Sequence, residues 1–295
     1  MIRVAAVDLG TNSTRLLVAD VEDGRVDEIV RRTVVTRLGE GVDARRRLLP
    51  LPIARVRNAL SDFRRELESL GAERTLAVAT SAVRDAENGE AFLGEVEWSY
   101  GFVTRLLSGD EEADLTQRGL GALDPGTLLL DVGGGSTELI AGEQRTSLDI
   151  GSVRLTERFL HGDPPTAAEL DAAAQQVRDL LPALEVRQAV GVAGTVAQLA
   201  LLSGTPDLRL AGIEGLLDGL ASLPLEERRH VRNLDPDRAP VIVGGALVVR
   251  EVLRHYGLDR LHFSVRDLLD GAALEAASLP AAVEGAAPPG AYACC

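Results

Sequence analysis

The stretch TLLLDVGGGSTELI, residues 127–140, constrains the fold more than any other part of the chain. An apolar run brings Asp131 to its end, three glycines follow, and a second apolar run begins after Glu138. This order predicts a strand, a tight turn and a second strand. Three consecutive glycines allow the backbone to approach a ligand closely, because no Cβ atom intervenes. We therefore expect a hairpin whose turn contacts a ligand; a glycine-rich turn that Asp131 merely caps is the alternative. The glycines are Gly133, Gly134 and Gly135.

The residue types in this hairpin suit a phosphate and a divalent cation. Backbone N–H groups in such a turn can line up to bind an anion, and the hydroxyls of Ser136 and Thr137 add donors. Asp131, held at the end of a strand beside the turn, is placed to hold a hydrated Mg²⁺ against a phosphate. The hairpin therefore predicts a phosphate-binding site with a metal ion.

The N-terminus, VAAVDLGTNSTRLLVA, repeats this pattern. Asp8 and Asp131 are 123 residues apart, and the same shift aligns the two stretches. Arg15 falls on Glu138, which is the one chemically opposite pair. Two such units half a chain apart predict a duplicated fold, with two lobes facing each other across a cleft and one Asp and one phosphate loop in each lobe. The other matched pairs are Gly10 and Gly133, Ser13 and Ser136, Thr14 and Thr137, and Leu16 and Leu139.

Length and composition indicate an ordinary globular protein. A chain of 295 residues accommodates one large domain or two medium ones. It contains no apolar run of membrane-spanning length and no apolar signal segment, so we expect a cytoplasmic protein that does not bind a membrane. The only cysteines, Cys294 and Cys295, lie in an Ala-, Pro- and Gly-rich end and offer no disulfide framework or metal site. We expect residues 286–295 to be a disordered tail.

The charges exclude several functions. All 31 basic residues are arginines, which excludes enzymes that depend on a P-loop lysine or a Schiff-base lysine. The formal net charge of -14 argues against a general nucleic-acid binder. Ten of the arginines nevertheless fall within residues 31–65. They form either ordinary solvated charges or a face that guides a polyanion, and the sequence leaves both interpretations open.

Periodicity predicts strands and helices in alternation, which is typical of α/β lobes. Beyond the central hairpin, strands are expected at 2–9, 14–21, 27–36, 75–80, 101–107, 188–193 and 261–265. Helices are expected at 53–70, 166–184, 194–202 and 241–257, and residues 143–155 should continue a meander. Gly194 and Thr195, in the turn after 188–193, form a third candidate anion site.

Five motifs together resemble one known family. VDLGTNSTRLLV, ATSAVRDAENG, SGDEEA, LLLDVGGGSTELI and GVAGTVAQLA occur in this order between Val4 and Gly271. They resemble the short, two-domain form of the exopolyphosphatase/guanosine pentaphosphate phosphatase family, within the acetate–sugar kinase, Hsp70 and actin superfamily. The resemblance implies an α/β fold of two actin-like (ribonuclease H-like) lobes around a central cleft, each with a mixed five-stranded sheet and flanking helices. The expected lobes are residues 1–122 and 123–267, with a helix at about 268–285 that returns to the first lobe.

The resemblance also implies an activity and assigns roles to residues. The activity is removal of the terminal phosphate from inorganic polyphosphate, or of a phosphate from guanosine pentaphosphate. Glu112 takes the place of the catalytic base, Glu138 that of a second active-site carboxylate, and Arg84 that of a catalytic phosphate ligand. Asp8 and Asp131 match the Mg²⁺ site, with Mn²⁺ as an alternative metal, and a homodimer is expected. The implied phosphate-binding residues are Gly10, Thr11, Asn12, Ser13, Arg15, Gly133, Gly134, Gly135, Ser136, Gly194 and Thr195.

The expected mechanism is attack on a terminal phosphorus by a water that Glu112 activates. Considered without the resemblance, Glu111 and Glu112 suit a helix dipole equally well. Asp114, where the family often has a basic residue, and the absence of lysine argue against strong binding of long polyphosphate. A guanosine pentaphosphate hydrolase, a non-catalytic sensor of alarmones or polyphosphate, and a kinase of the same superfamily remain as alternatives.

Overall fold

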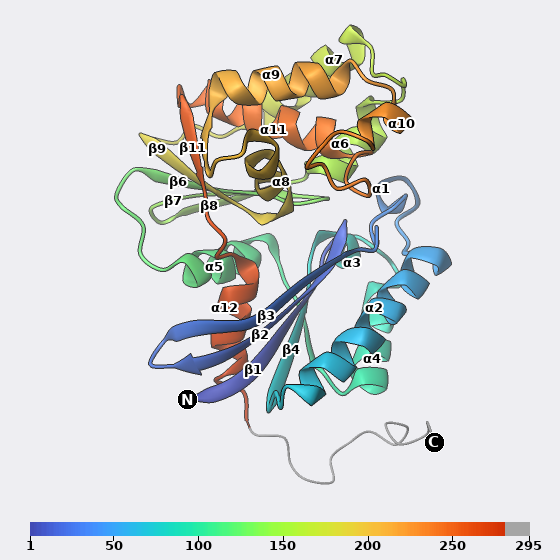
Figure 1. The fold of residues 1–295 in the computed structure, drawn as a ribbon, viewed down its shortest axis with the longest axis vertical. Helices are drawn as coiled ribbons and strands as arrows, with labels where there is room; N and C mark the ends of the chain where they lie inside the picture. Colours follow the sequence, from blue (N-terminus) through green and yellow to red (C-terminus); the bar gives the residue numbers. More distant parts are fainter. Residues whose placement is uncertain (281–295) are drawn as a thin grey trace. The chain divides into compact units, whose positions relative to one another are not determined.

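The structure, a computed structural model, describes residues 1–280, and its internal contacts divide the chain into two compact units. Unit 1 comprises residues 1–121 together with the segment that begins at Asp267, and unit 2 comprises residues 122–266. Each unit contains one mixed sheet with helices packed against it (Figure 1). The chain therefore leaves unit 1, builds all of unit 2, and returns to unit 1.

Unit 1 is built on a five-stranded sheet of order β3-β2-β1-β4-β5. The central strand β1 pairs antiparallel with β2 and parallel with β4. The strands are β1 (Ile2–Leu9), β2 (Ser13–Glu22), β3 (Arg25–Val35), β4 (Arg74–Ala79) and β5 (Val103–Leu106). The helices are α1 (Val42–Arg45), α2 (Pro50–Ser69), α3 (Ser81–Arg84), α4 (Gly89–Tyr100), α5 (Gly109–Leu120) and α12 (Leu268–Ala276).

Alternate residues of β1 pack on opposite faces of this sheet, as the period of a strand requires. Ala5 and Val7 lie in a hydrophobic cluster with side chains of α2 and α4. Val4 and Ala6 lie in a second cluster, with side chains of α5 and α12. Asp8 continues the second series, so its carboxylate emerges on the sheet face that α5 and α12 cover.

Unit 2 contains a sheet of six strands, in the order β10-β11-β9-β6-β7-β8. The expected number was five, and the difference is β10, which pairs antiparallel with β11. A strand of three residues is too short for its periodicity to be recognised. The strands are β6 (Thr127–Val132), β7 (Thr137–Ala141), β8 (Gln144–Leu148), β9 (Gln188–Val192), β10 (Asp207–Arg209) and β11 (Arg260–Phe263). The helices are α6 (Ser152–Phe159), α7 (Ala167–Leu180), α8 (Ala193–Ser203), α9 (Leu210–Ala221), α10 (Leu225–Arg228) and α11 (Ile242–His255).

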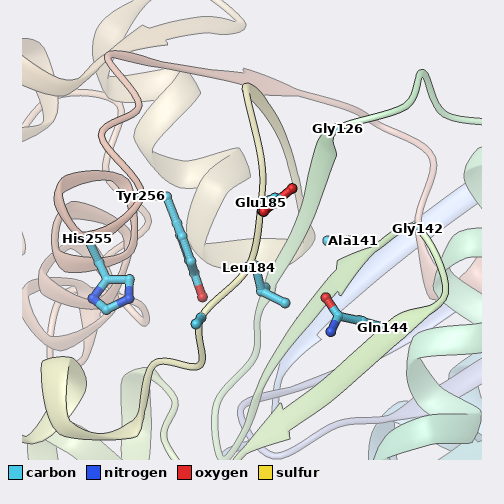
Figure 2. A pocket seen from close by; sticks show the side chains of 9 residues that line it. Gly126, Ala141, Gly142, Gln144, Leu184, Glu185, His255 and Tyr256 are labelled. Carbon is cyan, nitrogen blue, oxygen red and sulfur yellow. The ribbon is translucent and has the colours of Figure 1, made fainter.

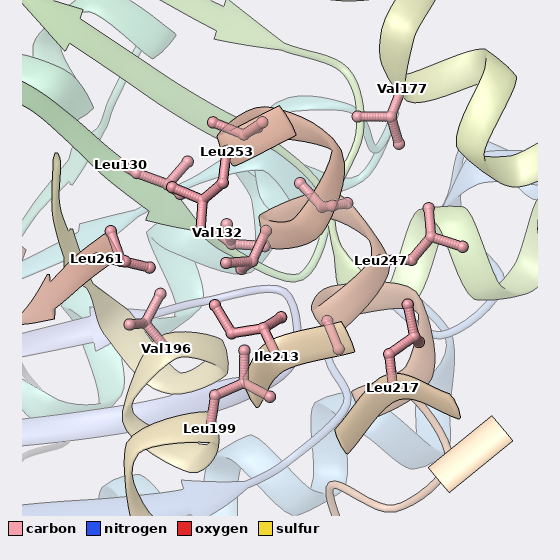
Figure 3. Close-up of a cluster of buried hydrophobic side chains, with 14 of the residues drawn as sticks. Leu130, Val132, Val177, Val196, Leu199, Ile213, Leu217, Leu247, Leu253 and Leu261 are labelled. Carbon is pink, nitrogen blue, oxygen red and sulfur yellow. The ribbon is translucent and has the colours of Figure 1, made fainter. Parts of the chain in front are cut away.

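One large hydrophobic cluster stabilises unit 2. Figure 3 shows Leu130 and Val132 of β6 among the side chains of α8, α9 and α11. Leu128 belongs to the same cluster. Because side chains alternate along a strand, Asp131 points to the opposite face of the sheet.

The two hairpins at the start of each unit have the same backbone geometry. In the β1–β2 hairpin, Asp8 lies opposite Arg15, and in the β6–β7 hairpin, Asp131 lies opposite Glu138. The amide of Gly10 donates to the carbonyl of Ser13 at 3.1 Å, and the equivalent bond from Gly133 to Ser136 is also 3.1 Å. The predicted repeat is therefore confirmed at the level of individual hydrogen bonds.

Most other predicted strands and helices are confirmed, with three corrections. Residues 152–159 form α6, whereas the expected meander extends to residue 155. The helix expected at 166–184 ends at Leu180, since Leu181 precedes Pro182 and the residue before a proline favours extended backbone. The helix expected over 268–285 ends at Ala276, whose carbonyl would clash with the ring of Pro280 in a continued helix.

The expected tail at 286–295, with both cysteines, lies outside the described residues. Within residues 1–280, no helix combines the length and apolar composition needed to cross a membrane.

The close packing of α12 on α5 provides a test of the fold. A Cβ atom added at Gly271 would overlap the carbonyl oxygen of Leu115, whereas one added at Gly215, an exposed position of α9, would meet nothing within 4 Å. We expect Gly271→Ala to destabilise the protein by about 1–3 kcal/mol through overpacking. Gly215→Ala should instead stabilise it by roughly 0.5–1 kcal/mol, because alanine favours a helix. Urea denaturation of both variants measures the difference, and equal stability of the two would refute the packing of α12 on α5.

Candidate active site

Asp8 is a buried carboxylate that hydrogen bonds only partly satisfy. Its Oδ2 accepts a hydrogen bond from Nε of Arg15 at 2.8 Å. Its buried Oδ1 has no hydrogen-bond partner within residues 1–280. Burial raises the pKa of Asp8, and the nearby Arg15 guanidinium opposes that shift. A buried polar atom without a partner is uncommon in proteins, and a cation is one explanation for it.

Arg15 is held by a second carboxylate, that of Asp267. Its Nη1 donates to Asp267, at the start of α12. Asp267 also accepts from the backbone amide of Leu269, as the N-cap of α12, and from Nη1 of Arg31 at 3.3 Å. Arg31 reaches Asp270 as well, with Nη2 at 2.9 Å from Oδ2. The predicted phosphate ligand Arg15 therefore belongs to a network of alternating charges that joins β1, β2, β3 and α12.

Sequence reasoning did not predict this network. In the sequence, Arg31 is one of ten arginines within residues 31–65, and no motif marks Asp267 or Asp270 as a contact of Arg15. The spacing of Asp267 and Asp270, three residues apart before an apolar run, is a capping-box signal, and the structure shows that box formed. The signal marks the start of a helix, however, and it does not reveal the contact with Arg15.

The two adjacent glutamates in the first turn of α5 make different contacts. Glu111 completes a capping box, accepting from the amide of Ser108 at 2.8 Å, and also accepts from Arg105 Nη2 at 2.6 Å. These two contacts lower the pKa of Glu111 to about 2. Glu112 is buried, with 7% of its surface exposed, and its Oε2 lies 3.5 Å from Nη1 of Arg84. The structure thus assigns the helix-capping role to Glu111 and brings Glu112 and Arg84 together.

The N-terminal turn is held by its own unit. The hydroxyl of Thr11 accepts a hydrogen bond from the amide of Ala82 at 3.2 Å. The carbonyl of Asn12 accepts from the amides of Thr36 and Arg37, at 3.1 and 2.8 Å. The side-chain Oδ1 of Asn12 is buried and lacks a partner within the described residues. The turn therefore presents a second unsatisfied polar atom close to Asp8 in sequence.

In unit 2, Asp131 and Glu138 lie opposite each other on neighbouring strands, and both are buried. Oε1 of Glu138 accepts a hydrogen bond from the hydroxyl of Ser147 in β8 at 2.8 Å. Ser147 is a further residue that sequence reasoning did not predict; it lies opposite Glu138 in the register of β7 and β8. Two carboxylates facing each other across a ladder repel, and a cation relieves such repulsion.

The glycine turn of unit 2 is supported by the start of α6. The amide of Ser152 donates to the carbonyl of Gly133 at 2.9 Å, and the amide of Val153 donates to that of Gly134 at 2.8 Å. A Cβ atom at Gly151 would lie 2.6 Å from Gly134, so only glycine permits this approach. The correction of residues 152–155 from meander to helix therefore matters for the site, because this helix positions the turn.

The guanidinium of Arg238 lies against the third candidate turn, which contains Gly194 and Thr195. A Cβ atom at Gly194 would overlap the guanidinium of Arg238, so the glycine allows that group to lie on the turn. Thr195 is buried against Gly245 of α11, where a Cβ atom would come 2.6 Å from its methyl group. Arg238 is another residue that sequence reasoning did not predict, since no motif includes it.

Asp8 and Asp131 suit a metal ion whose remaining ligands are water and substrate phosphate. Within residues 1–280, no three or more His, Cys, Asp or Glu side chains are grouped closely enough to form a metal cage. Mg²⁺ commonly binds through one or two carboxylates, with water and substrate phosphate completing its shell. The unsatisfied oxygen of Asp8 fits such a site, and Asp131 occupies the equivalent position in unit 2.

A cavity of about 690 Å³ in unit 2 lies away from these residues. Figure 2 shows Gly126, Gln144 and Tyr256 around it. Gly126 precedes β6, whereas Asp131 lies near the other end of that strand. The hydroxyl of Tyr256 donates to the carbonyl of Pro182 at 2.7 Å, and burial raises its pKa to about 12. The cavity contains none of the predicted site residues.

Comparison with known proteins confirms the family resemblance. Residues 17–278 match the Ppx/GppA phosphatase family. The chain is 40% identical to Exopolyphosphatase 2 of Mycobacterium tuberculosis, with 93% of this chain and 98% of that protein covered. It is 30% identical to guanosine-5'-triphosphate,3'-diphosphate pyrophosphatase of Vibrio vulnificus, over 92% of this chain and 58% of that protein. The structure of the Aquifex aeolicus PPX-GPPA enzyme aligns with a TM-score of 0.74 at 30% identity, covering 93% of this chain and 99% of that one.

The hairpins, the matched family and the related structure agree with one another. The chain belongs to the Ppx/GppA phosphatase family: it is a phosphoanhydride hydrolase with an actin-like α/β fold.

Proposed function

We propose that this enzyme is an exopolyphosphatase, which hydrolyses the terminal phosphate of inorganic polyphosphate. The observation that carries the proposal is that Glu111 and Glu112 have different contacts. Glu111 caps α5, whereas Glu112 is a buried carboxylate beside Arg84 and takes no part in the cap. A base and a cation together are what attack by water on a phosphoanhydride requires. The 40% identity to an exopolyphosphatase of Mycobacterium tuberculosis supports the choice of substrate.

In the proposed reaction, Glu112 accepts a proton from a water molecule as the water oxygen attacks the terminal phosphorus. The new P–O bond forms as the bridging P–O bond breaks, and the shortened chain leaves as the anion. Arg84 and the backbone amides of the glycine turns hold the phosphate oxygens, and arginine suits this through its two parallel donors. The proposed Mg²⁺ ligands are Asp8 in unit 1 and Asp131 in unit 2, and the metal would supply neutralisation of the phosphate charge.

Guanosine pentaphosphate is the second candidate substrate. The relative in Vibrio vulnificus is a guanosine-5'-triphosphate,3'-diphosphate pyrophosphatase, and it matches 92% of this chain. Hydrolysis of either compound needs the same base and the same phosphate turns, so the residues above serve both proposals.

The first prediction tests the base. We expect Glu112→Gln to lower kcat for phosphate release about 10²–10⁴-fold, since the amide cannot accept the proton. The control is the same substitution one residue earlier, Glu111→Gln, which should lower the Tm by weakening the capping box but retain kcat. Malachite-green detection of orthophosphate, with circular dichroism to verify folding, measures both. A Glu112→Gln enzyme with normal kcat would refute the assignment.

The second prediction tests the metal site by stability rather than by turnover. Without metal, Asp8→Asn should raise the Tm, because it removes a buried charge whose Oδ1 is unpaired while Arg15 retains Asp267. Adding Mg²⁺ should raise the Tm of the wild type and leave that of the variant unchanged. Calorimetry with EDTA and with MgCl₂ measures both effects, and an equal Mg²⁺ response in the two proteins would argue against Asp8 as a ligand.

The third prediction concerns the substrate. We expect kcat/KM for polyphosphate to exceed that for guanosine pentaphosphate and for ATP at least tenfold in parallel assays with Mg²⁺. A preference for guanosine pentaphosphate would select the second candidate. ATP consumption that depends on an added acceptor would indicate a kinase instead.

A further inference from the structure

The ten arginines of residues 31–65 fall into different classes in the structure. Six of them form ion pairs with carboxylates of unit 1. Arg45, Arg46 and Arg47 are exposed and have no ion-pair partner within residues 1–280. The six paired residues are Arg31, Arg32, Arg55, Arg57, Arg64 and Arg65.

We propose that Arg45, Arg46 and Arg47 form a subsite for the distal phosphates of a polyphosphate chain whose end lies in the catalytic site. The proposal rests on the exopolyphosphatase function above. It names a binding surface outside the catalytic residues, with an inorganic polyanion as its ligand.

The loop that carries the three arginines has a fixed backbone. The amide of Arg46 donates to the carbonyl of Val42 at 2.8 Å, and the carbonyl of Arg46 accepts from the amide of Glu87 at 2.8 Å. Leu48 exchanges two hydrogen bonds with the side chain of Asn88, at 2.8 and 3.1 Å. Three consecutive cations therefore extend from an anchored loop, which lowers the entropy that is lost when they bind a ligand.

Arg46 has a backbone conformation that favours other residues. Its φ of 53° lies in the left-handed region, which glycine adopts without penalty and asparagine adopts more readily than arginine does. An arginine in this conformation is strained, and such strain often accompanies function. Within the described residues, the Arg46 side chain is exposed and forms no ion pair. Binding of an anion by its guanidinium would account for an arginine at this position.

The loop is connected to the predicted phosphate turn of the same unit. The amide of Gly39 donates to the carbonyl of Thr11 at 2.8 Å, and the amide of Val42 donates to the carbonyl of Gly39 at 3.0 Å. A Cβ atom at Gly39 would overlap the methyl group of Thr11, so the two segments are in direct contact. Two hydrogen bonds thus join the turn to α1, which ends at Arg45, the first of the three arginines.

The charge balance favours a polyanion over a compact ligand. The protein carries a formal net charge of -14, so anions are repelled except where cations lack compensating carboxylates. Guanidinium groups bind phosphate oxygens through paired donors. A compact guanosine nucleotide gains little binding affinity from a subsite beyond the catalytic turn. A long polyphosphate chain extends further, and its additional phosphates can bind the three arginines.

The experiment compares long and short polyphosphate chains in two charge-matched variants. One replaces Arg45, Arg46 and Arg47 by Gln, and the control replaces Arg57, Arg64 and Arg65, which are ion-paired, by Gln. The measured quantity is the ratio of kcat/KM for a chain of about 100 phosphates to that for tripolyphosphate. For the first variant we expect this ratio to fall at least tenfold through KM, with a shallower dependence of KM on salt. The control should keep the ratio within about twofold of the wild type, since surface ion pairs contribute little.

Two further measurements keep the proposal falsifiable. A variant with lysine at all three positions retains the charge and should recover most of the ratio, which separates binding from misfolding. Direct titration of wild type and the Gln variant with long polyphosphate, read by calorimetry, does not depend on turnover. Arginine-dependent binding without hydrolysis would support the subsite and refute the proposed function. Hydrolysis with equal ratios in all variants would support the function and overturn the subsite, as would equally tight arginine-dependent binding of single-stranded RNA.

Discussion

The contact of Arg15 with both Asp8 and Asp267 is the interaction on which unit 1 depends. Burying a carboxylate is costly, and Arg15 compensates two at once, while Arg31 adds a further contact to Asp267. The network joins the first strand to the last helix, across a sequence separation of 252 residues. Removing Arg15 would leave the Asp8 carboxylate buried without this partner, and a loss of that kind typically costs about 3–5 kcal/mol. Arg15 therefore has a structural role beside any contact with phosphate.

The same position carries the opposite charge in unit 2. Glu138 replaces Arg15 in the repeat, so the first hairpin pairs a carboxylate with a guanidinium and the second pairs two carboxylates. The first arrangement is close to neutral and suits a scaffold. The second is electrostatically unfavourable unless a cation or donors such as Ser147 are present. One duplicated backbone thus provides two chemically different sites, and the difference lies in a single side chain.

Local patterns predicted the hairpins and the longer helices α2, α7, α8 and α11, because each depends on neighbours within a few residues, whereas α4 and α9 were not predicted. The role of Glu112 came from the family resemblance. The same reasoning missed β10, which is too short for a period, and α6, whose start depends on Gly151 packing against Gly134. It also missed Asp267, Arg238 and Ser147. Asp267 contacts Arg15 in unit 1 and Arg238 contacts Gly194 in unit 2, each from a distant segment of its own unit. Ser147 reaches Glu138 through strand register. The arginine-rich region shows the limit clearly, since composition alone does not distinguish paired Arg57 from unpaired Arg46.

The sequence by itself determined the duplicated turn, with an aspartate, a glycine and a hydroxyl at matching positions, because backbone conformation at a tight turn depends on the residues within it. Only the tertiary structure decided which charges compensate one another. Glu111 and Glu112 are adjacent and chemically alike, yet one caps α5 and the other is buried beside Arg84. Electrostatic roles depend on distance and burial in space, and both arise from contacts between segments far apart in the chain.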